Sequence, residues 1–309
     1  MSAFGCDKGA FCSMRPASLP PASTRPTENE VVRMNGKAVD ADAFDRFEAA
    51  SWGRRTDGYE QFFVSLTSRT ITPLLDAAGV GPGTRVLDIA SGPGHVAAAC
   101  AARGASVTGL DIAPEMVALA GRRHPGIRFE RADAQRLPFP EASADAVVGN
   151  FAILHVGRPE LVAGEAARVL APGGTLALST WDVPARCRLL GVFLDAIGEV
   201  GAVPPPDVPV GPPFFRFADD DECTRLLTGA GLTGVGVQTI TFGHRVGTAA
   251  ELWEGMIGGT VRTRALVLSQ PDDVQGRIRG AFERITAEYA TPDGLDLPVS
   301  VKIVSGVRP

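Results

Sequence analysis

The sequence predicts an α/β protein with a doubly wound, mostly parallel seven-stranded sheet, and three observations support this. First, short apolar runs typical of buried strands alternate with helical runs between residues 85 and 180. Second, the segment 85–94 (RVLDIASGPG) is an apolar run that ends in a glycine turn, and an alanine-rich run follows it. Third, the runs 235–244 and 297–306 supply two further strands, and we expect the last to be antiparallel to the rest.

Composition divides the chain into four parts. Residues 1–35 are rich in Pro, Ser and Ala without any period, and we expect a disordered tail with no chemistry. Residues 36–80 form an amino-terminal helical part, with a helical pattern from about 42 to 78 that GVGPGT ends. Residues 81–181 hold the alternating core, and residues 182–309 hold insertions and the strands that complete the sheet.

Within the core, the strands and helices follow one another in regular alternation. We predict strands at 85–89, 106–110, 127–130, 144–149 and 175–180, and helices at 94–103, 114–122 and 159–170. Ligands of such sheets bind beyond the carboxyl ends of the strands, at the point where the strand order reverses. The residues that follow each strand are therefore the candidates for a binding site.

The glycine turn after the first strand favours an anionic or hydroxyl-rich ligand. Gly92 and Gly94 allow a sharp bend and leave no side chain over the loop. The first N–H groups of the next helix point outward with the positive end of the helix dipole. Asp111 ends the second strand at roughly the 20-residue distance of the dinucleotide fingerprint. A nicotinamide or flavin enzyme and an S-adenosylmethionine (SAM) enzyme both fit this pattern.

Asp88 separates these two alternatives. It lies inside the first strand, where an ionised carboxylate is costly unless a cationic or hydrogen-bonding group meets it. The ammonium group of SAM would meet that need, directly or through water. The segment VLDIASGPG resembles the first motif of class I SAM-dependent methyltransferases, usually VLDxGxGxG, and the resemblance covers about residues 50–240. It implies a Rossmann-like methyltransferase fold similar to the ubiquinone/menaquinone type, with SAM as the cofactor.

The resemblance also implies contacts with the nucleoside of SAM. Asp111 would accept both ribose hydroxyls, with Ile112 beside it. Met116 would cover one face of the adenine, although a core methionine fits equally well. Asp133 would accept the adenine amino group, and the Ala134 backbone N–H would donate to a ring nitrogen.

The loop departs from the motif at Ala90 and Ser91, which replace the usual glycine and small residue. We expect Ala90 to have a negative φ, so that the change affects local geometry more than the choice of cofactor. His95 follows the turn and would contact the methionine end of SAM. The resemblance places amino-terminal helices over the cleft, where Tyr59 is either a cofactor contact or core packing. The remaining predicted cofactor contacts are Asp88, Gly92, Gly94, Asn150 and Phe151.

The segments after residue 181 are predicted to form a lid over the substrate. The proline-dense run AVPPPDVPVGPPFFRF stiffens an extended path, and helical patterns at 248–258 and 271–290 follow it. Aromatic side chains here would form a largely apolar pocket, although core packing accounts for some of them. The predicted substrate-binding residues are His155, Trp181, Phe214, Phe215, His244 and Trp253.

His155 is the predicted catalytic residue because it follows the fourth strand, near the place where methyl group and acceptor should meet. A structural role at a helix start is the alternative. Methyl transfer from a sulfonium is an in-line displacement, so the protein mainly aligns the reactants and excludes water. A base helps only when the acceptor must lose a proton.

The composition argues against several other classes. The chain has a net charge of −5 and no Lys/Arg cluster, which disfavours nucleic acid. No apolar run reaches a membrane span, and no signal peptide is evident. Five cysteines without metal spacing predict free thiols in a cytoplasmic protein, and the acids at 219–222 fit a helix start better than a metal site. We expect a monomer or homodimer without a metal.

The predicted function is methyl transfer from SAM to a small lipophilic or aromatic metabolite, in specialised metabolism. The sequence leaves open whether the acceptor atom is oxygen, nitrogen or carbon. One alternative keeps the fold but uses SAM structurally, for cyclisation or decarboxylation. The other is an NAD(P)-dependent oxidoreductase, which Asp88 and the Asp133-Ala134 pair disfavour.

Overall fold

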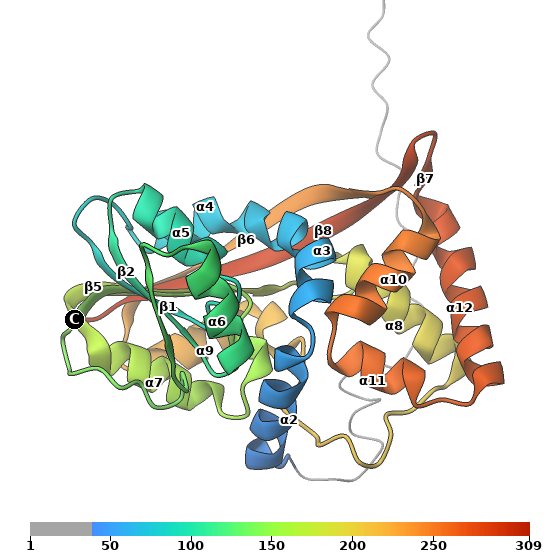
Figure 1. Ribbon diagram of the computed structural model, residues 1–309, viewed down its shortest axis with the longest axis horizontal. Helices are drawn as coiled ribbons and strands as arrows, with labels where there is room; N and C mark the ends of the chain where they lie inside the picture. Colours follow the sequence, from blue (N-terminus) through green and yellow to red (C-terminus); the bar gives the residue numbers. More distant parts are fainter. Residues whose placement is uncertain (1–38) are drawn as a thin grey trace, which may run out of the picture.

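The computed structural model describes residues 39–309, so the tail predicted for 1–35 lies outside the described residues. The centre of the molecule is one mixed sheet with the order β3-β2-β1-β4-β5-β8-β6, and β7 pairs with β8 beyond this path (Figure 1). The strands are β1 (Arg85–Ile89), β2 (Ser106–Asp111), β3 (Arg128–Arg131), β4 (Ala144–Gly149), β5 (Leu170–Trp181), β6 (Thr233–Val246), β7 (Ala290–Thr291) and β8 (Gly294–Val307).

The predicted doubly wound sheet is confirmed. The pairs among β1 to β5 are parallel, whereas β8 is antiparallel to both β5 and β6. The last long strand is thus the antiparallel one, as expected, and the two-residue β7 adds an eighth strand. The strand order reverses between β1 and β4, so the carboxyl ends of these two strands mark the switch point.

Helices cover both faces of the sheet because side chains alternate between the faces along each strand. Val86 packs in the cluster that includes buried residues of α4 and α5, whereas Leu87 packs with those of α7 and α9. Figure 1 shows the two pairs of helices on opposite sides of the strands. The core helices are α4 (Ile71–Ala77), α5 (His95–Ala102), α6 (Pro114–Arg123), α7 (Pro159–Val169) and α9 (Asp220–Gly229).

The amino-terminal helical pattern is divided into several helices rather than one. Asp40 caps the first of them by accepting a hydrogen bond from the Ala43 backbone N–H at 3.0 Å. The chain leaves this helix at Arg54 and then continues toward the core. In Figure 1 the first two helices lie between the core and the carboxyl-terminal helices. The elements are α2 (Ala41–Gly53), α3 (Thr56–Thr67) and η1 (Ser68–Thr70), which leads into α4.

A layer of helices lies at one end of the sheet, within the segments for which the sequence predicted a lid; we call it the lid layer, and its role as a lid stays a prediction. It covers the extended ends of β6 and β8 (Figure 1). Its core contains Phe193, Trp253 and Phe282, whose ring centroids lie 4.4 to 5.4 Å apart. No helix in residues 39–309 is long and apolar enough to cross a membrane. The helices are α8 (Arg188–Val200), α10 (Ala249–Gly259), α11 (Arg262–Leu268) and α12 (Asp272–Thr286), and α11 was not predicted.

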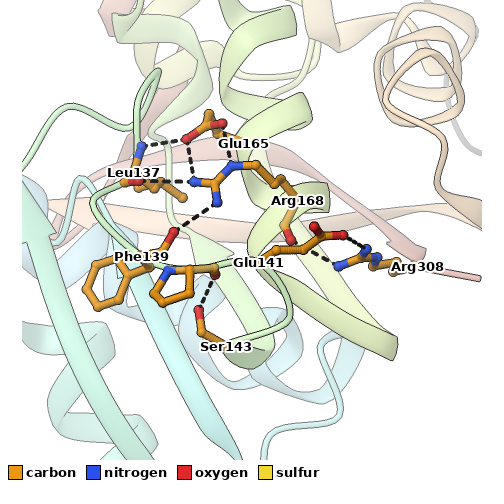
Figure 2. A network of polar contacts seen from close by, with 8 residues as sticks. Leu137, Phe139, Glu141, Ser143, Glu165, Arg168 and Arg308 are labelled. Carbon is orange, nitrogen blue, oxygen red and sulfur yellow. Dashed lines mark hydrogen bonds and ion pairs between the residues drawn. The ribbon is translucent and has the colours of Figure 1, made fainter.

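A network around Arg168 of α7 fixes the loop that joins β3 to β4 (Figure 2). Arg168 donates to both carboxylate oxygens of Glu165 at 2.8 Å, and to the backbone oxygens of Phe139 and Leu137. Glu165 in turn accepts from the Leu137 backbone N–H at 2.8 Å. Because these bonds hold the loop to α7, they also position the residues that precede it at the end of β3.

Candidate functional site

Two neighbouring cavities lie at the carboxyl ends of β1, β2 and β4. The first, which we call the cofactor cavity, has roughly 1120 Å³ of empty space including its opening to solvent, and the second, the acceptor cavity, has roughly 720 Å³ on the same measure. They meet at side chains that line both of them, namely Trp52, Tyr59, Thr67, Phe151 and His155.

The cofactor cavity collects most of the residues predicted for cofactor binding. They come from the ends of four strands, from the glycine loop and from α3, which are distant in the sequence. Asp88 and Gly94 do not line the cavity. Those that do are Tyr59, Ala90, Ser91, Gly92, His95, Asp111, Ile112, Met116, Asp133, Ala134, Asn150 and Phe151.

Asp111 is held rigidly at the end of β2. Its Oδ2 accepts from the Gly92 backbone N–H and its Oδ1 from the Ala113 backbone N–H, both at 2.9 Å. The residue is 8% exposed. Burial raises the pKa of Asp111, and the N–H groups of Ala113 and Gly92 oppose this shift. Each oxygen still has a lone pair for a ligand hydroxyl, so the carboxylate is oriented for a bidentate contact.

Asp88 has a very different environment, although it precedes the same loop. It is 1% exposed, and neither carboxylate oxygen makes a hydrogen bond within the described part of the chain. Burial raises the pKa of Asp88 well above its ordinary value, and the nearby Ala97 N–H lowers it only in part. Asp88 does not line the cofactor cavity, so its expected meeting with a ligand ammonium group stays a prediction.

The glycine loop corrects one expectation about its backbone. Ala90 has a φ of +52°, so the expected negative φ is wrong. The turn requires the left-handed conformation at this position, which costs an alanine roughly 1–2 kcal/mol. This strain explains why the related motif usually has glycine here.

The two glycines of the loop serve different purposes. A side chain at Gly92 (φ +52°) would meet no atom within 4 Å, and this glycine lines the cavity, so the space beside it is open to a ligand. At Gly94 (φ +88°) a Cβ would lie 2.7 Å from the ring of Phe129 and 2.9 Å from His124. Gly94 is therefore required by packing and by the start of α5, not by the ligand.

Ser91 supplies an unused polar group to the same wall. Its hydroxyl is buried and has no hydrogen-bond partner among residues 39–309, yet the residue lines the cofactor cavity. A buried hydroxyl without a hydrogen-bond partner destabilises the protein unless a ligand or a water molecule supplies that hydrogen bond. The loop is thus suited to a polar ligand.

The end of β4 is shaped by a hydrogen-bonded turn. The Asn150 side-chain oxygen accepts from Ser179 at 2.6 Å and from Thr70 at 2.7 Å. Phe151 has a φ of +56°, and its N–H donates to the Ser179 hydroxyl at 2.9 Å. The Phe151 ring stacks on Trp181 at a centroid distance of 4.0 Å and faces both cavities. Asn150 thus has internal partners, while Phe151 presents an aromatic wall.

The acceptor cavity is lined mainly by aromatic and aliphatic side chains from α3, β5, α8 and the lid. Of the predicted substrate-binding residues, His155, Trp181, Phe214 and Phe215 line it. His244 and Trp253 line neither cavity. His244 packs edge-on against Phe62, and Trp253 is buried among Phe193 and Phe282, so both positions follow from core packing.

The sequence reasoning missed the contribution of α2. Asp45, Glu48, Ala49 and Trp52 line the cofactor cavity, and they follow one another at intervals of three, one and three along one face of this helix. Two acids on the inner face of an amphipathic helix are unusual, because buried carboxylates need partners. These two acids among the apolar positions of α2 were the sequence feature that could have predicted its place in the site.

Gln135 was also missed. It lines the cofactor cavity, and its side-chain amide donates to Asp45 at 2.9 Å. The backbone N–H of Gln135 donates to Asp133 at 2.8 Å. Gln135 therefore links the end of β3 to α2 across the cavity.

Comparison with known proteins agrees with this geometry. A family model described as a methyltransferase domain matches residues 87–178. A demethylmenaquinone methyltransferase of Beutenbergia cavernae is 34% identical over 177 residues, which cover 55% of this chain and 74% of that protein. An uncharacterized protein of Mycobacterium bovis is 32% identical over 166 residues, and the chain spans only 58% of that relative's length.

Solved structures share the fold. The YcgJ protein of Bacillus subtilis superimposes with a TM-score of 0.51 at 19% identity, over 78% of this chain and 98% of that chain. A putative methyltransferase of Bacillus halodurans gives a TM-score of 0.50 at 20% identity, over 77% and 98%. These matches show a shared fold, and the relative from Beutenbergia, with the family model, establishes the family. The chain belongs to the class I SAM-dependent methyltransferases, in the group that contains the demethylmenaquinone methyltransferases.

Proposed function

We propose that the protein transfers a methyl group from SAM to a small, lipophilic aromatic acceptor. The observation that carries this proposal is the meeting of two cavities at shared side chains. One cavity has polar groups at strand ends that suit a nucleoside, and the other has aromatic walls. A methyl donor in the first and an acceptor in the second would have their reacting atoms near His155.

The residues of the cofactor cavity fit SAM in charge and in hydrogen-bonding capacity. Asp111 would hold the ribose hydroxyls, and Asp133 with the Ala134 N–H would hold the adenine. The unpartnered hydroxyl of Ser91 and the open space beside Gly92 would receive the methionine end. SAM supplies the activated methyl group, so the protein needs to bind, align and exclude water.

The acceptor cavity favours a flat, apolar acceptor. Trp181 and Phe151 form a stacked pair on one side, and Phe214 and Phe215 lie in edge-on contact on the lid side. Aromatic walls favour aromatic ligands through stacked and edge-on contacts. The name of the Beutenbergia relative points to a quinone-type acceptor, whose flat ring would stack against aromatic walls of this kind.

Calorimetry and methyl transfer test the proposal together. We expect S-adenosylhomocysteine to bind the purified protein, and NADH not to bind. With SAM carrying a labelled methyl group and 1,4-dihydroxynaphthalene as the probe, we expect label in the organic product. Binding of NADH without S-adenosylhomocysteine binding would contradict the cofactor assignment. Binding of S-adenosylhomocysteine without label in any product would favour a structural use of SAM. The cytoplasmic location, specialised metabolism and the monomer or homodimer stay predictions.

A further inference from the structure

Glu48 of α2 is a buried carboxylate that contacts the predicted catalytic histidine. The residue is 2% exposed. Its Oε2 lies 3.0 Å from Nδ1 of His155 and accepts a hydrogen bond from Nε1 of Trp52 at 2.9 Å. Its Oε1 accepts from Nε of Arg262 at 3.1 Å. One side chain thus joins the amino-terminal helix, the end of the core and the lid.

His155 and Arg262 of α11 together keep Glu48 in its ionised form. Burial by itself would raise the pKa of Glu48, but His155 and Arg262 more than offset this and leave the pKa below its ordinary value. Arg262 is itself fixed by the Leu154 backbone oxygen at 2.5 Å and by the rings of Phe44 and Phe214. Glu48 is therefore a rigid carboxylate that can only accept hydrogen bonds.

The ionised state of Glu48 determines which nitrogen of a neutral His155 carries the proton. Nδ1 faces the carboxylate and must donate, so the lone pair is on Nε2. Nε2 makes no hydrogen bond to any group in residues 39–309, and the imidazole lines both cavities. The rings of Trp52 and Phe214 hold the imidazole by edge-on contacts at 5.0 and 6.2 Å.

We propose that Glu48 is a positioning residue that holds His155 as the Nδ1–H tautomer, so that Nε2 accepts a proton from a hydroxyl of the acceptor. This inference rests on the proposed methyl transfer and narrows the acceptor to a hydroxylated aromatic molecule methylated at oxygen. A bond forms between the acceptor oxygen and the methyl carbon while the bond from sulfur to that carbon breaks. The hydroxyl proton moves to Nε2, and the resulting imidazolium is paired with Glu48.

Nitrogen-15 NMR of the imidazole rings measures this tautomer directly. The chain has only four histidines, so each signal can be assigned by substitution. In the complex with S-adenosylhomocysteine, we expect the neutral imidazole of His155 to be the Nδ1–H tautomer. In Glu48→Leu we expect the Nε2–H tautomer, which free imidazole side chains prefer. Glu48→Gln should retain the wild-type tautomer, because its amide oxygen still accepts from Nδ1.

His95 provides a matched control in the same spectrum. It faces Glu60 with the other nitrogen, Nε2, at 3.3 Å. Glu60→Gln should therefore leave the His155 signals unchanged. An Nε2–H tautomer of His155 in the wild-type protein would overturn the proposal, and this result needs no variant to fold. The same tautomer in wild type and Glu48→Leu would also overturn it.

The requirement for a hydroxyl on the acceptor is tested with two probes that share the same fused ring and differ only in a hydroxyl group. Adding 1-naphthol to the S-adenosylhomocysteine complex should shift the Nε2 signal of His155, whereas naphthalene should not. No shift with 1-naphthol, or an equal shift with both, contradicts the hydroxyl assignment. Loss of S-adenosylhomocysteine binding by calorimetry would instead contradict the proposed function, while the tautomer of His155 remains measurable.

Discussion

Asp111 and Asp88 are two buried carboxylates with opposite surroundings, although they lie in adjacent strands. Asp111 accepts two backbone hydrogen bonds and lines the cofactor cavity. Asp88 accepts none among residues 39–309 and does not line the cavity. A buried polar group without a hydrogen-bond partner lowers the free energy of unfolding. Asp111 can therefore serve ligand binding at little cost in stability, whereas Asp88 destabilises the folded protein.

Replacing Asp111 should weaken cofactor binding. In Asp111→Ala we expect the binding free energy of S-adenosylhomocysteine to fall by about 1–3 kcal/mol, the range for hydrogen bonds to a charged group. Isothermal titration calorimetry measures this. The control is Asp145→Ala, which removes an exposed ion pair with Arg85 at the far end of the sheet and should leave affinity unchanged. Equal losses in both variants would remove Asp111 from the ribose site.

Replacing Asp88 should stabilise the protein in a pH-dependent manner. The raised pKa means that the folded state binds this proton more tightly than the unfolded state, so stability falls as pH rises above the unfolded value near 3.8. Asp88→Asn removes this effect. At pH 7 without ligand we expect a gain of roughly 1–3 kcal/mol in the free energy of unfolding, which disappears toward pH 3.5.

Urea unfolding at several pH values checks this prediction. Asp145 is the control for Asp88, because its pKa is shifted in the opposite direction: the hydrogen bond from Arg85 lowers the pKa of Asp145. Asp145→Asn should therefore lose a little stability at pH 7 rather than gain it. A gain for Asp88→Asn that does not depend on pH would show that the pKa of Asp88 is not raised in the folded protein.

Helices α3 and α10 pack closely because glycines face the contact. A Cβ at Gly259 would lie 2.5 Å from the ring of Phe63, and one at Gly255 would overlap the ring of Phe62. These contacts attach the amino-terminal helices to the lid beside the acceptor cavity. The glycines are helical positions where alanine would otherwise be preferred.

Gly255→Ala should therefore destabilise the protein despite the higher helix propensity of alanine. We expect a loss of about 1–3 kcal/mol in the free energy of unfolding, because a methyl group must displace the Phe62 ring. Gly280→Ala in α12 is the matched control, since nothing lies within 4 Å of its Cβ position. There we expect a gain of about 0.5–1 kcal/mol. Equal effects in denaturant unfolding would show that the contact can adjust.

At the level of elements, the sequence predicted the core better than the ends of the chain. The strands β1 to β5 begin or end within a few residues of their predicted limits, because apolar runs between turns define them. The predicted amino-terminal pattern is continuous, whereas the chain breaks between α2 and α3. The short α11 lacks any period that distinguishes it, and only its packing defines it.

The whole molecule places both cavities between three parts that are separate in sequence. The core supplies the strand ends, α2 and α3 supply one wall, and the segments around α8 and α11 supply another. Figure 1 shows α2 and α3 between the core and the lid helices. A ligand in the cofactor cavity therefore contacts two of these parts at once.

Binding of S-adenosylhomocysteine should stabilise α2 and α3 more than distant helices. A ligand at 100 times its Kd stabilises the folded state by about 2.7 kcal/mol. We expect amide hydrogen exchange to slow in α2 and α3, while α12, whose residues line neither cavity, gains no additional local protection. Equal slowing in all three helices would show global stabilisation alone. Unchanged exchange in α2 would contradict its place in the cofactor cavity.

The sequence by itself determined the strands of the core and the polar residues at the strand ends, because local periodicity and turn residues encode them. The strand order, and with it the switch point between β1 and β4, came from the structure. Only the tertiary structure decided that Glu48 faces His155 and Arg262, since His155 and Arg262 lie 107 and 214 positions from Glu48 in the sequence. It likewise decided that His244 and Trp253 belong to the core. Contacts between distant side chains depend on how helices pack, and no local pattern records that.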